Sequence, residues 1–296
     1  ENLLPSFNAS LNVNSTSQEP TFCIAGNCQL KPLKEWLALS FPFCKIIQLA
    51  QYQVIKSQSE IDQWINHAEN ADIVMMIKVN ESYRGFRFGS NNIRCKLSSK
   101  NKFIEYPNIR LDVFYPFFGY AKNKAGGTLR GRKIVSLGHI YGDSHDFLAM
   151  VLSKMKKDIQ YNFFEKIIQI EKDPNFCSDV INKLGIGSYK EFEKRNPEYI
   201  ELLRSDINNC LMHTFNHPNI KFLNEVYKYI WQNKFGLQRK DFIDLKKNPL
   251  NKRNIPIPSF VYKSITQKNE DFPWKFVKEN NKKFPSESIE IYLSNV

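Results

Sequence analysis

Short apolar runs alternate with helical patterns in the first third of the chain. Five runs have the length and composition of β-strands: Thr21–Ala25, Phe43–Leu49, Ala71–Ile77, Lys102–Tyr106 and Asp112–Phe118. Between them, the apolar spacing predicts one helix after Gln29, with Pro32 in its first turn, and another at Ser59–His67 opened by a serine cap. Because strands that alternate with helices pair in parallel, the pattern predicts a mostly parallel α/β sheet with flanking helices.

After residue 143 the apolar spacing becomes helical and stays so. The predicted helices are Ser144–Lys157, Tyr161–Glu171, Ser178–Leu184, Ser188–Arg195, Glu198–Asn209 and Pro218–Lys234. Proline-containing sequence beyond this point interrupts any long element. We therefore divide the chain into a flexible leader (1–19), an α/β domain with a helical second half (20–237) and a basic, proline-containing C-terminal arm (238–296).

Basic residues exceed acidic ones by 42 to 30, which gives a formal net charge of +12. The excess is concentrated between residues 84 and 133 and between residues 239 and 283. Such tracts favour an anionic partner, although lysines that only solvate the surface explain them as well. Basic and aromatic residues interleave at Tyr83–Phe88, but the rest of an RNA-binding motif is missing, so we expect no nucleic acid partner.

No apolar run reaches the roughly 18 residues of a membrane-spanning helix, so we expect no transmembrane segment, while peripheral association with a membrane surface stays open. The six cysteines are scattered and lack the paired spacing of a zinc site or a disulfide scaffold. We therefore expect free thiols in a reducing compartment, and no metal cofactor.

The segment Gly26–Gln29 follows the first predicted strand and precedes the first helix. In open α/β sheets, ligands bind at the ends of strands where such turns lie. Cys28 would meet the positive end of the helix dipole, which favours a thiolate and suits an oxyanion or a phosphate. Cys28 is therefore a candidate nucleophile, with a buried packing role as the alternative, whereas Cys23, within the strand, is expected in the core.

Two histidine-containing segments are candidates for acid–base chemistry. His217 precedes Pro218, which suits the first helical position, so we expect His217 at or near the cap of the last helix. Histidine caps helices poorly, which favours another use for it, although an ordinary surface histidine fits too. The stretch His139–Asp146, which includes His145, holds two histidines and two carboxylates and could equally be a simple helix cap.

The glycine-rich, cationic stretch Ala125–Lys133 is expected to form a flexible loop. Its basic residues could close over a phosphorylated ligand, and a solvated surface loop is the alternative. The phosphate-binding patterns of nucleotide enzymes are absent from the chain.

Four segments together resemble the WcbI-like polysaccharide biosynthesis family in order and spacing, over roughly residues 20–237. They are Ala25–Gln29, Ala71–Val74, Tyr106–Asn108 with Phe117–Tyr120, and Phe215–Pro218. The glycine-asparagine-cysteine-glutamine and asparagine-histidine-proline segments are the most specific. The chain departs from the family at Ala121–Lys124, so that side of the pocket is expected to differ.

The resemblance implies a coenzyme A (CoA)-dependent O-acetyltransferase that acts on a sugar of a capsular or other surface polysaccharide. Its α/β fold would be Rossmann-like or SGNH-like, acetyl-CoA or CoA would be the co-substrate, and the acceptor would be a polysaccharide or a nucleotide sugar. The predicted catalytic residues are Cys28, Asn27, Gln29, His145, Asn216 and His217. The predicted cofactor-binding residues are Gly26, Arg84, Arg87, Arg130, Arg132 and Lys133.

Within this scheme His217 would deprotonate the sugar hydroxyl, and the amides of Asn27 and Gln29 with nearby backbone N–H groups would stabilise the developing negative charge. Whether Cys28 carries the acetyl group stays open. An SGNH-like esterase or deacetylase and a non-enzymatic polyanion-binding module are the alternatives. We expect a cytoplasmic location, or the inner face of the membrane, and capsule-assembly proteins as partners.

Overall fold

The structure is a computed structural model that describes residues 19–98, 102–111, 190–206, 212–214 and 216–250, with short segments at 118–120, 144–146, 173–175, 178, 257–258 and 274–275. The chain forms two compact units. Unit 1 comprises Glu1–Asn108, Arg195–Leu202 and Ile220–Leu250, and unit 2 comprises Ile109–Lys194, Leu203–Asn219 and Asn251–Val296.

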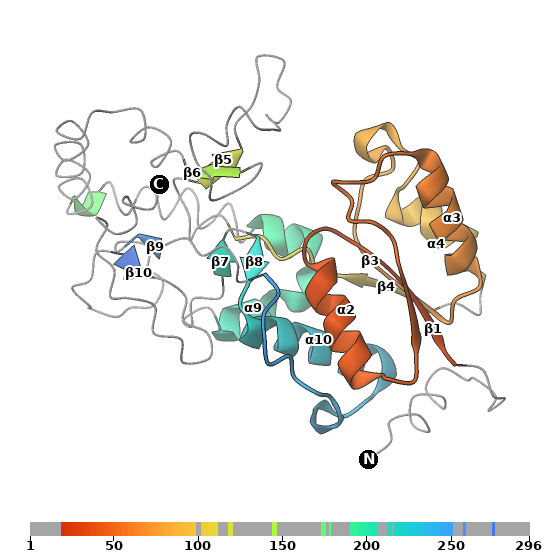
Figure 1. Cartoon of the computed structure of the whole chain (residues 1–296). Helices are drawn as coiled ribbons and strands as arrows, with labels where there is room; N and C mark the ends of the chain where they lie inside the picture. The colour runs from red at the N-terminus through yellow and green to blue at the C-terminus, as the bar shows by residue number, and fades with distance from the viewer. Residues whose placement is uncertain are drawn as a thin grey trace. The chain divides into compact units, whose positions relative to one another are not determined.

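Unit 1 is built on a four-stranded sheet, shown in Figure 1. Its strands are β1 (Thr21–Ala25), β2 (Lys45–Gln48), β3 (Ile73–Ile77) and β4 (Lys102–Tyr106). They pair in the order β2-β1-β3-β4, and every pair is parallel. All five residues of β3 are buried, as a strand covered on both faces requires. The predicted parallel α/β sheet is confirmed, and β1 and β4 have the predicted bounds.

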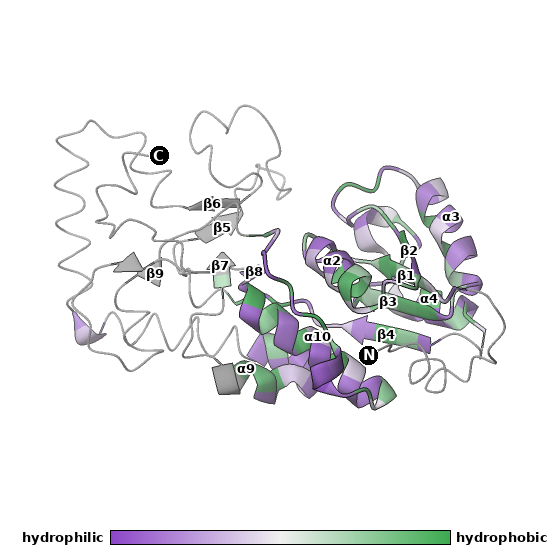
Figure 2. Ribbon diagram, turned by 60° about the horizontal axis from the view of Figure 1, so that its bottom comes forward, coloured by the Kyte–Doolittle hydropathy of each residue, from purple (hydrophilic) through white to green (hydrophobic). Residues whose placement is uncertain are grey.

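Helices cover both faces of this sheet. Helices α2 (Leu30–Ser40) and α10 (Ile220–Phe235) lie on one side, and α3 (Gln58–Glu69) and α4 (Ser90–Lys96) on the other (Figure 1). In Figure 2, β1 and β3 are mainly hydrophobic, while α3 and α10 mix hydrophobic and hydrophilic residues. This amphipathic pattern is what buries one face of each helix and exposes the other.

Aromatic side chains fill the layer between the sheet and α10. Phe22 of β1 contacts the rings of Phe41 and Trp231, each at a centroid distance of 5.7 Å. Trp36 of α2 contacts Tyr227 of α10 at 5.4 Å. Because such rings contribute a large buried apolar area, they fix α2 and α10 against β1.

The start of α3 follows the sequence prediction closely. The helix begins at Gln58, one residue before the predicted start, and Ser57 is its cap. The Ser57 hydroxyl accepts a hydrogen bond from the Glu60 N–H at 3.3 Å. A serine cap thus satisfies one of the N–H groups that a helix start leaves unpaired.

Residues 238–250 pack in unit 1, although the sequence places them in an extended arm. The Asn224 amide of α10 accepts from the Leu245 N–H at 3.0 Å and donates to the Leu245 carbonyl at 3.3 Å. Phe242 contacts the rings of Trp36 and Phe41 at 5.2 and 6.0 Å. Leu245 and Leu250 are also buried, so this part of the chain belongs to the core.

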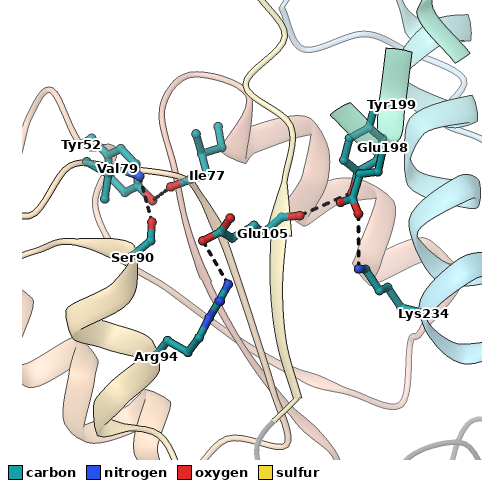
Figure 3. Close-up of polar contacts among 9 residues, drawn as sticks. All are labelled: Tyr52, Ile77, Val79, Ser90, Arg94, Glu105, Glu198, Tyr199 and Lys234. Carbon is teal, nitrogen blue, oxygen red and sulfur yellow. Dashed lines mark hydrogen bonds and ion pairs between the residues drawn. The ribbon is translucent and has the colours of Figure 1, made fainter. Parts of the chain in front are cut away.

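Polar contacts tie the outer strand β4 to its neighbours, as Figure 3 shows. Arg94 of α4 pairs with the Glu105 carboxylate at 3.2 Å. The Tyr199 hydroxyl, from the 3-10 turn η3 (Pro197–Tyr199), donates to the Glu105 carbonyl at 3.4 Å. Lys234 of α10 pairs with Glu198 at 3.5 Å. Exposed ion pairs contribute little energy, but together these contacts fix the strand whose end reaches the candidate site.

Unit 2 contains short antiparallel pairs. They are β5 (Phe118–Tyr120) with β6 (Ser144–Asp146), β7 (Met212–Thr214) with β8 (His217–Pro218), and β9 (Ile257–Pro258) with β10 (Trp274–Lys275). Residues 190–194 of unit 2 are helical, as is Arg195 of unit 1, and α9 (Ile200–Asp206) begins in unit 1 after η3 and ends in unit 2. Of the helices in the described part of the chain, none has the length and hydropathy of a membrane-spanning segment.

Two predicted helix starts are wrong. Ser144 begins strand β6 rather than a helix, because it pairs with Tyr120 of β5. His217 and Pro218 form strand β8, and α10 begins two residues later, at Ile220. In both cases a strand pairing overrides a local capping preference.

Other predicted elements lie wholly or partly outside the described residues. Those outside are the helix at Tyr161–Glu171, most of Ser178–Leu184, and the part of the predicted strand at Asp112–Phe118 before Phe118. The predicted helix at Glu198–Asn209 corresponds to η3 and α9 as far as Asp206.

Candidate active site

The turn Gly26–Gln29 lies at the carboxyl end of β1, next to β3 in the sheet. The chain leaves β1 toward β2 on one side, and it leaves β3 toward β4 on the other. Such a reversal of strand order is a topological switch point, where open α/β sheets bind their ligands. The sequence-predicted turn therefore occupies the position in this sheet that is best suited to a site.

Position 26 requires a glycine because the Tyr106 side chain lies too close to leave room for a Cβ atom. A Cβ atom at Gly26 would overlap the Tyr106 hydroxyl and lie 3.2 Å from its Cζ atom. That hydroxyl donates a hydrogen bond to the Ala25 carbonyl at 3.1 Å. The Tyr106 side chain is buried, and this burial raises its pKa well above the ordinary value. Tyr106 is therefore a neutral donor packed directly against the turn.

Asn27 holds the turn in shape through its side-chain amide. Its Oδ1 accepts from the Gln29 N–H at 2.9 Å, and its backbone carbonyl accepts from the Leu30 N–H at 3.0 Å. Its Nδ2 donates to Oδ1 of Asn108, beyond the end of β4, at 3.0 Å. Asparagine favours such local turns because its side chain can replace a backbone acceptor. The predicted oxyanion-stabilising amide of Asn27 therefore also has a structural role.

Cys28 stands two residues before the first residue of α2 and is partly exposed. The first turn of α2 has no acidic residue, so the positive end of its dipole is not offset by a carboxylate there. Partial exposure at a helix N-terminus is a setting that promotes thiolate chemistry. Cys28 is therefore not fully buried, and its role as a nucleophile stays a prediction.

The neighbouring cysteines differ from Cys28. Cys23 is fully buried in β1, as predicted, and burial raises its pKa to about 12. The pKa of Cys44 is also raised to about 12, chiefly by burial and further by the charges of Asp72 and Glu19. Cys95 in α4 is exposed. Cys23 and Cys44 are thus poor nucleophiles near neutral pH, and Cys95 is a useful exposed reference thiol.

Gln29 is only 2% exposed, so its side chain is buried at the start of α2. A ligand that approaches from solvent does not meet a buried amide directly. Its predicted role as a donor to the reacting oxygen stays a prediction.

The loop after β2 is fastened to the same turn through Tyr52. The Tyr52 N–H donates to the Gly26 carbonyl at 2.9 Å, and its hydroxyl donates to the Ile77 carbonyl at the end of β3, also at 2.9 Å. Tyr52 is buried, which raises the pKa of its phenol well above the ordinary value. One residue thereby links the ends of β1 and β3 at the switch point.

Arg84 links its own loop, after β3, to the loop after β2. Its Nη1 atom lies 3.2, 2.8 and 3.5 Å from the carbonyls of Tyr52, Gln53 and Ile55. Its backbone has a φ of 55°, which is unusual for a residue other than glycine and suggests that the loop conformation is imposed. Arg84 therefore shapes the loop, in addition to its predicted role toward a phosphate.

Arg87 is exposed, and only its backbone is fixed, by an N–H bond to Gln58 Oε1 at 2.9 Å. The remaining predicted phosphate ligands, Arg130, Arg132 and Lys133, lie outside the described residues.

The predicted histidines lie in unit 2. His145 is opposite Gly119 in the pairing of β5 with β6, and His217 is opposite Thr214 in the pairing of β7 with β8. Asn216 lies in the turn before His217. Cys28 belongs to unit 1, so the joint action of these residues with Cys28 stays a prediction.

Sequence reasoning missed the roles of Tyr106 and Asn108 in the turn. A proline-asparagine pair directly after a predicted parallel strand was the available signal, because strand ends gather at one edge of the sheet. Within the described ranges, no group of three or more histidine, cysteine, aspartate or glutamate residues could hold a metal ion.

Together, the sheet order and the partly exposed Cys28 at the switch point define an α/β protein whose candidate ligand site lies at the end of β1. Residues 21–239 match the family model of the polysaccharide biosynthesis enzyme WcbI. The chain belongs to this family, which confirms the resemblance seen in the sequence.

A solved structure of WcbI has the same fold, with a TM-score of 0.69 and 15% sequence identity. The match covers 94% of this chain and 89% of that one. That protein is described as a novel polysaccharide biosynthesis enzyme, in its native form without a disulfide bond between CoA and a cysteine. A comparison with curated proteins finds no match.

Proposed function

We propose that this protein is a CoA-dependent O-acetyltransferase that acts on a sugar of a capsular or other surface polysaccharide. The observation that carries the proposal is the partly exposed Cys28 on a braced turn at the switch point of the sheet. Membership of a family of polysaccharide biosynthesis enzymes supports a carbohydrate acceptor. The description of the WcbI structure, which relates CoA to a cysteine, supports the co-substrate.

The proposed site suits the thioester end of acetyl-CoA. Cys28 lies at the positive end of α2, where negative charge that develops on a carbonyl oxygen is stabilised. The exposed Arg87 is a candidate contact for the phosphates of CoA, and Arg84 acts mainly by shaping the loop. Salt should weaken such phosphate contacts, because they are exposed to solvent.

Two reaction routes are consistent with these residues. In direct transfer, the sugar hydroxyl oxygen bonds to the acetyl carbon, the carbon–sulfur bond breaks, CoA leaves as a thiolate, and the hydroxyl proton passes to a base, for which His217 is the predicted residue. In the two-step route, Cys28 first takes the acetyl group and releases CoA, and the sugar hydroxyl then displaces Cys28. In the first route Cys28 shapes the site, and in the second it is the nucleophile.

The deciding experiment measures whether acetyl-CoA reacts at this site. Radiolabelled acetyl-CoA is mixed with the protein and a panel of polysaccharide and nucleotide-sugar acceptors, and acetyl transfer is followed with the parent chain, Cys28→Ser and Cys95→Ser. We expect transfer by the parent and by Cys95→Ser, and a loss in Cys28→Ser on the two-step route. Mass spectrometry of the acid-quenched protein without acceptor shows whether an acetyl group resides on Cys28.

Protection from alkylation tests co-substrate binding separately. If the thiol end of CoA lies beside Cys28, CoA should slow the reaction of Cys28 with iodoacetamide and leave Cys95 unchanged. Equal alkylation with and without CoA would contradict the proposed placement.

The same fold position would serve a nucleophile in an SGNH-like esterase or deacetylase. Release of free acetate from acetylated sugars, without any use of acetyl-CoA, would favour that function. Binding of unrelated polyanions without either reaction would favour the binding module. A cytoplasmic location and capsule-assembly partners stay predictions.

A further inference from the structure

Two side chains from the end of β4 hold the turn that carries Cys28. Tyr106 donates to the Ala25 carbonyl at 3.1 Å, and Asn108 accepts from Asn27 Nδ2 at 3.0 Å. In an extended segment, residues two apart lie on the same side, so both can reach one neighbouring element. Pro107 between them is buried and has a fixed φ, which reduces the freedom of this short segment.

The bond to Asn108 and the bond from the Gln29 N–H together hold the Asn27 amide in one orientation. With Nδ2 engaged by Asn108, the oxygen of the amide is directed to the Gln29 N–H, at 2.9 Å. If the amide turned over, an N–H group would face the Gln29 N–H, and two donors would oppose each other. A residue 81 positions away therefore helps to hold the amide orientation that closes the turn around Cys28.

We propose that Asn108 is a positioning residue for Cys28 and that it acts through the amide of Asn27. The chain of contact runs from Asn108 Oδ1 to Asn27 Nδ2, and from Asn27 Oδ1 to the N–H of Gln29, the residue after Cys28. Asn108 acts on the shape of the turn and on the placement of the thiol at the N-terminus of α2. The inference deepens the proposed function, because it concerns the same turn, but it does not depend on the identity of the group that Cys28 meets.

The first measurement is amide hydrogen exchange at Gln29, read by NMR. In Asn108→Ala, the Asn27 amide loses the partner that fixes it, so we expect exchange of the Gln29 N–H to accelerate by about 10-fold or more, while amides in β1 and the middle of α2 are unchanged. Asn66→Ala, on the exposed side of α3, is the matched control and should have no effect.

The second measurement is the alkylation rate of Cys28 by iodoacetamide relative to exposed Cys95. Loosening the turn takes the thiol away from the helix N-terminus, so we expect Asn108→Ala to slow alkylation at neutral pH by about 3-fold or more. Asn27→Ala should slow Cys28 alkylation to a similar extent. Alkylation of the double variant should be no slower than that of the slower single variant, because both changes break the same chain of hydrogen bonds.

Local positioning and general destabilisation give different results. General destabilisation would also expose the buried thiol of Cys23 and the partly buried thiol of Cys44 and speed their alkylation, which a positioning role does not do. Asn108→Asp keeps an oxygen acceptor for Asn27 and should preserve slow exchange at Gln29. Its alkylation rate is compared at about pH 9.5, above the ordinary thiol pKa, so that its added charge has little influence.

The inference is wrong if Asn108→Ala leaves both the Gln29 exchange and the Cys28 alkylation at parent values, or if the effects of Asn27→Ala and Asn108→Ala add fully. Should Asn108→Ala fail to fold, fast Gln29 exchange in a folded Asn108→Asp would overturn it as well. Neither measurement uses acetyl-CoA. Failure of acetyl transfer with these results intact would therefore refute the proposed function alone.

Discussion

Gly26 is the position at which the smallest change to the chain should have a large effect. Replacing Gly26 with alanine adds a Cβ atom that overlaps the Tyr106 hydroxyl, and the next contacts are Tyr106 Cζ at 3.2 Å and Ile77 Cδ1 at 3.4 Å. Tyr106 is 3% exposed, so its ring has little room to move. Overpacking of this kind costs about 1–3 kcal/mol.

Displacement of the Tyr106 hydroxyl adds a second cost. If it moves away, the Ala25 carbonyl loses this hydrogen bond, and the loss of a hydrogen bond costs about 0.5–1.5 kcal/mol. Because the two effects overlap, we expect Gly26→Ala to lower the free energy of unfolding by about 2–4 kcal/mol. For a domain of this size, that corresponds to a fall in Tm of roughly 5–15 °C.

Urea unfolding followed by circular dichroism measures the effect, and Tyr106→Phe tests its cause. Removing the hydroxyl removes the overlapping atom, so the double variant should be within about 1 kcal/mol of Tyr106→Phe alone. Gly85→Ala is the contrasting control. Gly85 has a φ of 82° with open space around it, so its cost of about 1–2 kcal/mol comes from the backbone and Tyr106→Phe should not relieve it.

Two results would refute the reasoning on Gly26. One is a Gly26→Ala variant as stable as the parent chain. The other is a double variant that is destabilised by the full sum of the two single changes, since independent sites add and an overlapping pair does not.

Three further predictions concern the proposed chemistry. Cys28 should react with iodoacetamide faster than Cys23 and Cys44, because the thiol pKa values of those two residues are both raised to about 12. Timed mass spectrometry of the peptides measures the rates, and equal rates would indicate that Cys28 has only a packing role. His217→Ala should lower turnover by about 100-fold and change CoA affinity only a few-fold. His145→Ala is the comparison, and a loss of turnover in that variant alone would assign the general base to His145. CoA binding measured by calorimetry should weaken as salt rises, and heat that does not change with salt would argue against phosphate contacts with basic side chains.

The local pattern of the sequence was enough to predict the central sheet. Strands β1 and β4 have the predicted bounds, and β3 was recognised from a run that is apolar at almost every position. Continuous apolar runs are typical of strands buried on both faces, so the parallel pairing followed directly. The place of Cys28 between β1 and α2 could be predicted for the same reason, because strand, turn and helix are adjacent in the chain.

Contacts between distant segments could not be predicted in this way. Nothing in the local sequence shows that Asn108 binds Asn27, or that Tyr106 packs on Gly26, because both contacts depend on how β4 pairs in the sheet. At Pro218 a local preference led to a wrong prediction. Its preference for a helix start is real, but pairing with β7 places it in a strand.

The packing of residues 238–250 shows that the end of the family match and the end of the folded unit differ, although the two are often assumed to coincide. Similarity to the family ends at residue 239, yet Asn224 holds Leu245 by two hydrogen bonds, and Phe242 lies against two buried rings of the core. A chain cut at the end of the family match would uncover Trp36 and Phe41 and would be prone to aggregation. The end of the family match therefore falls inside unit 1 of this protein. A shortened form intended for crystallisation or assay should extend at least to residue 250.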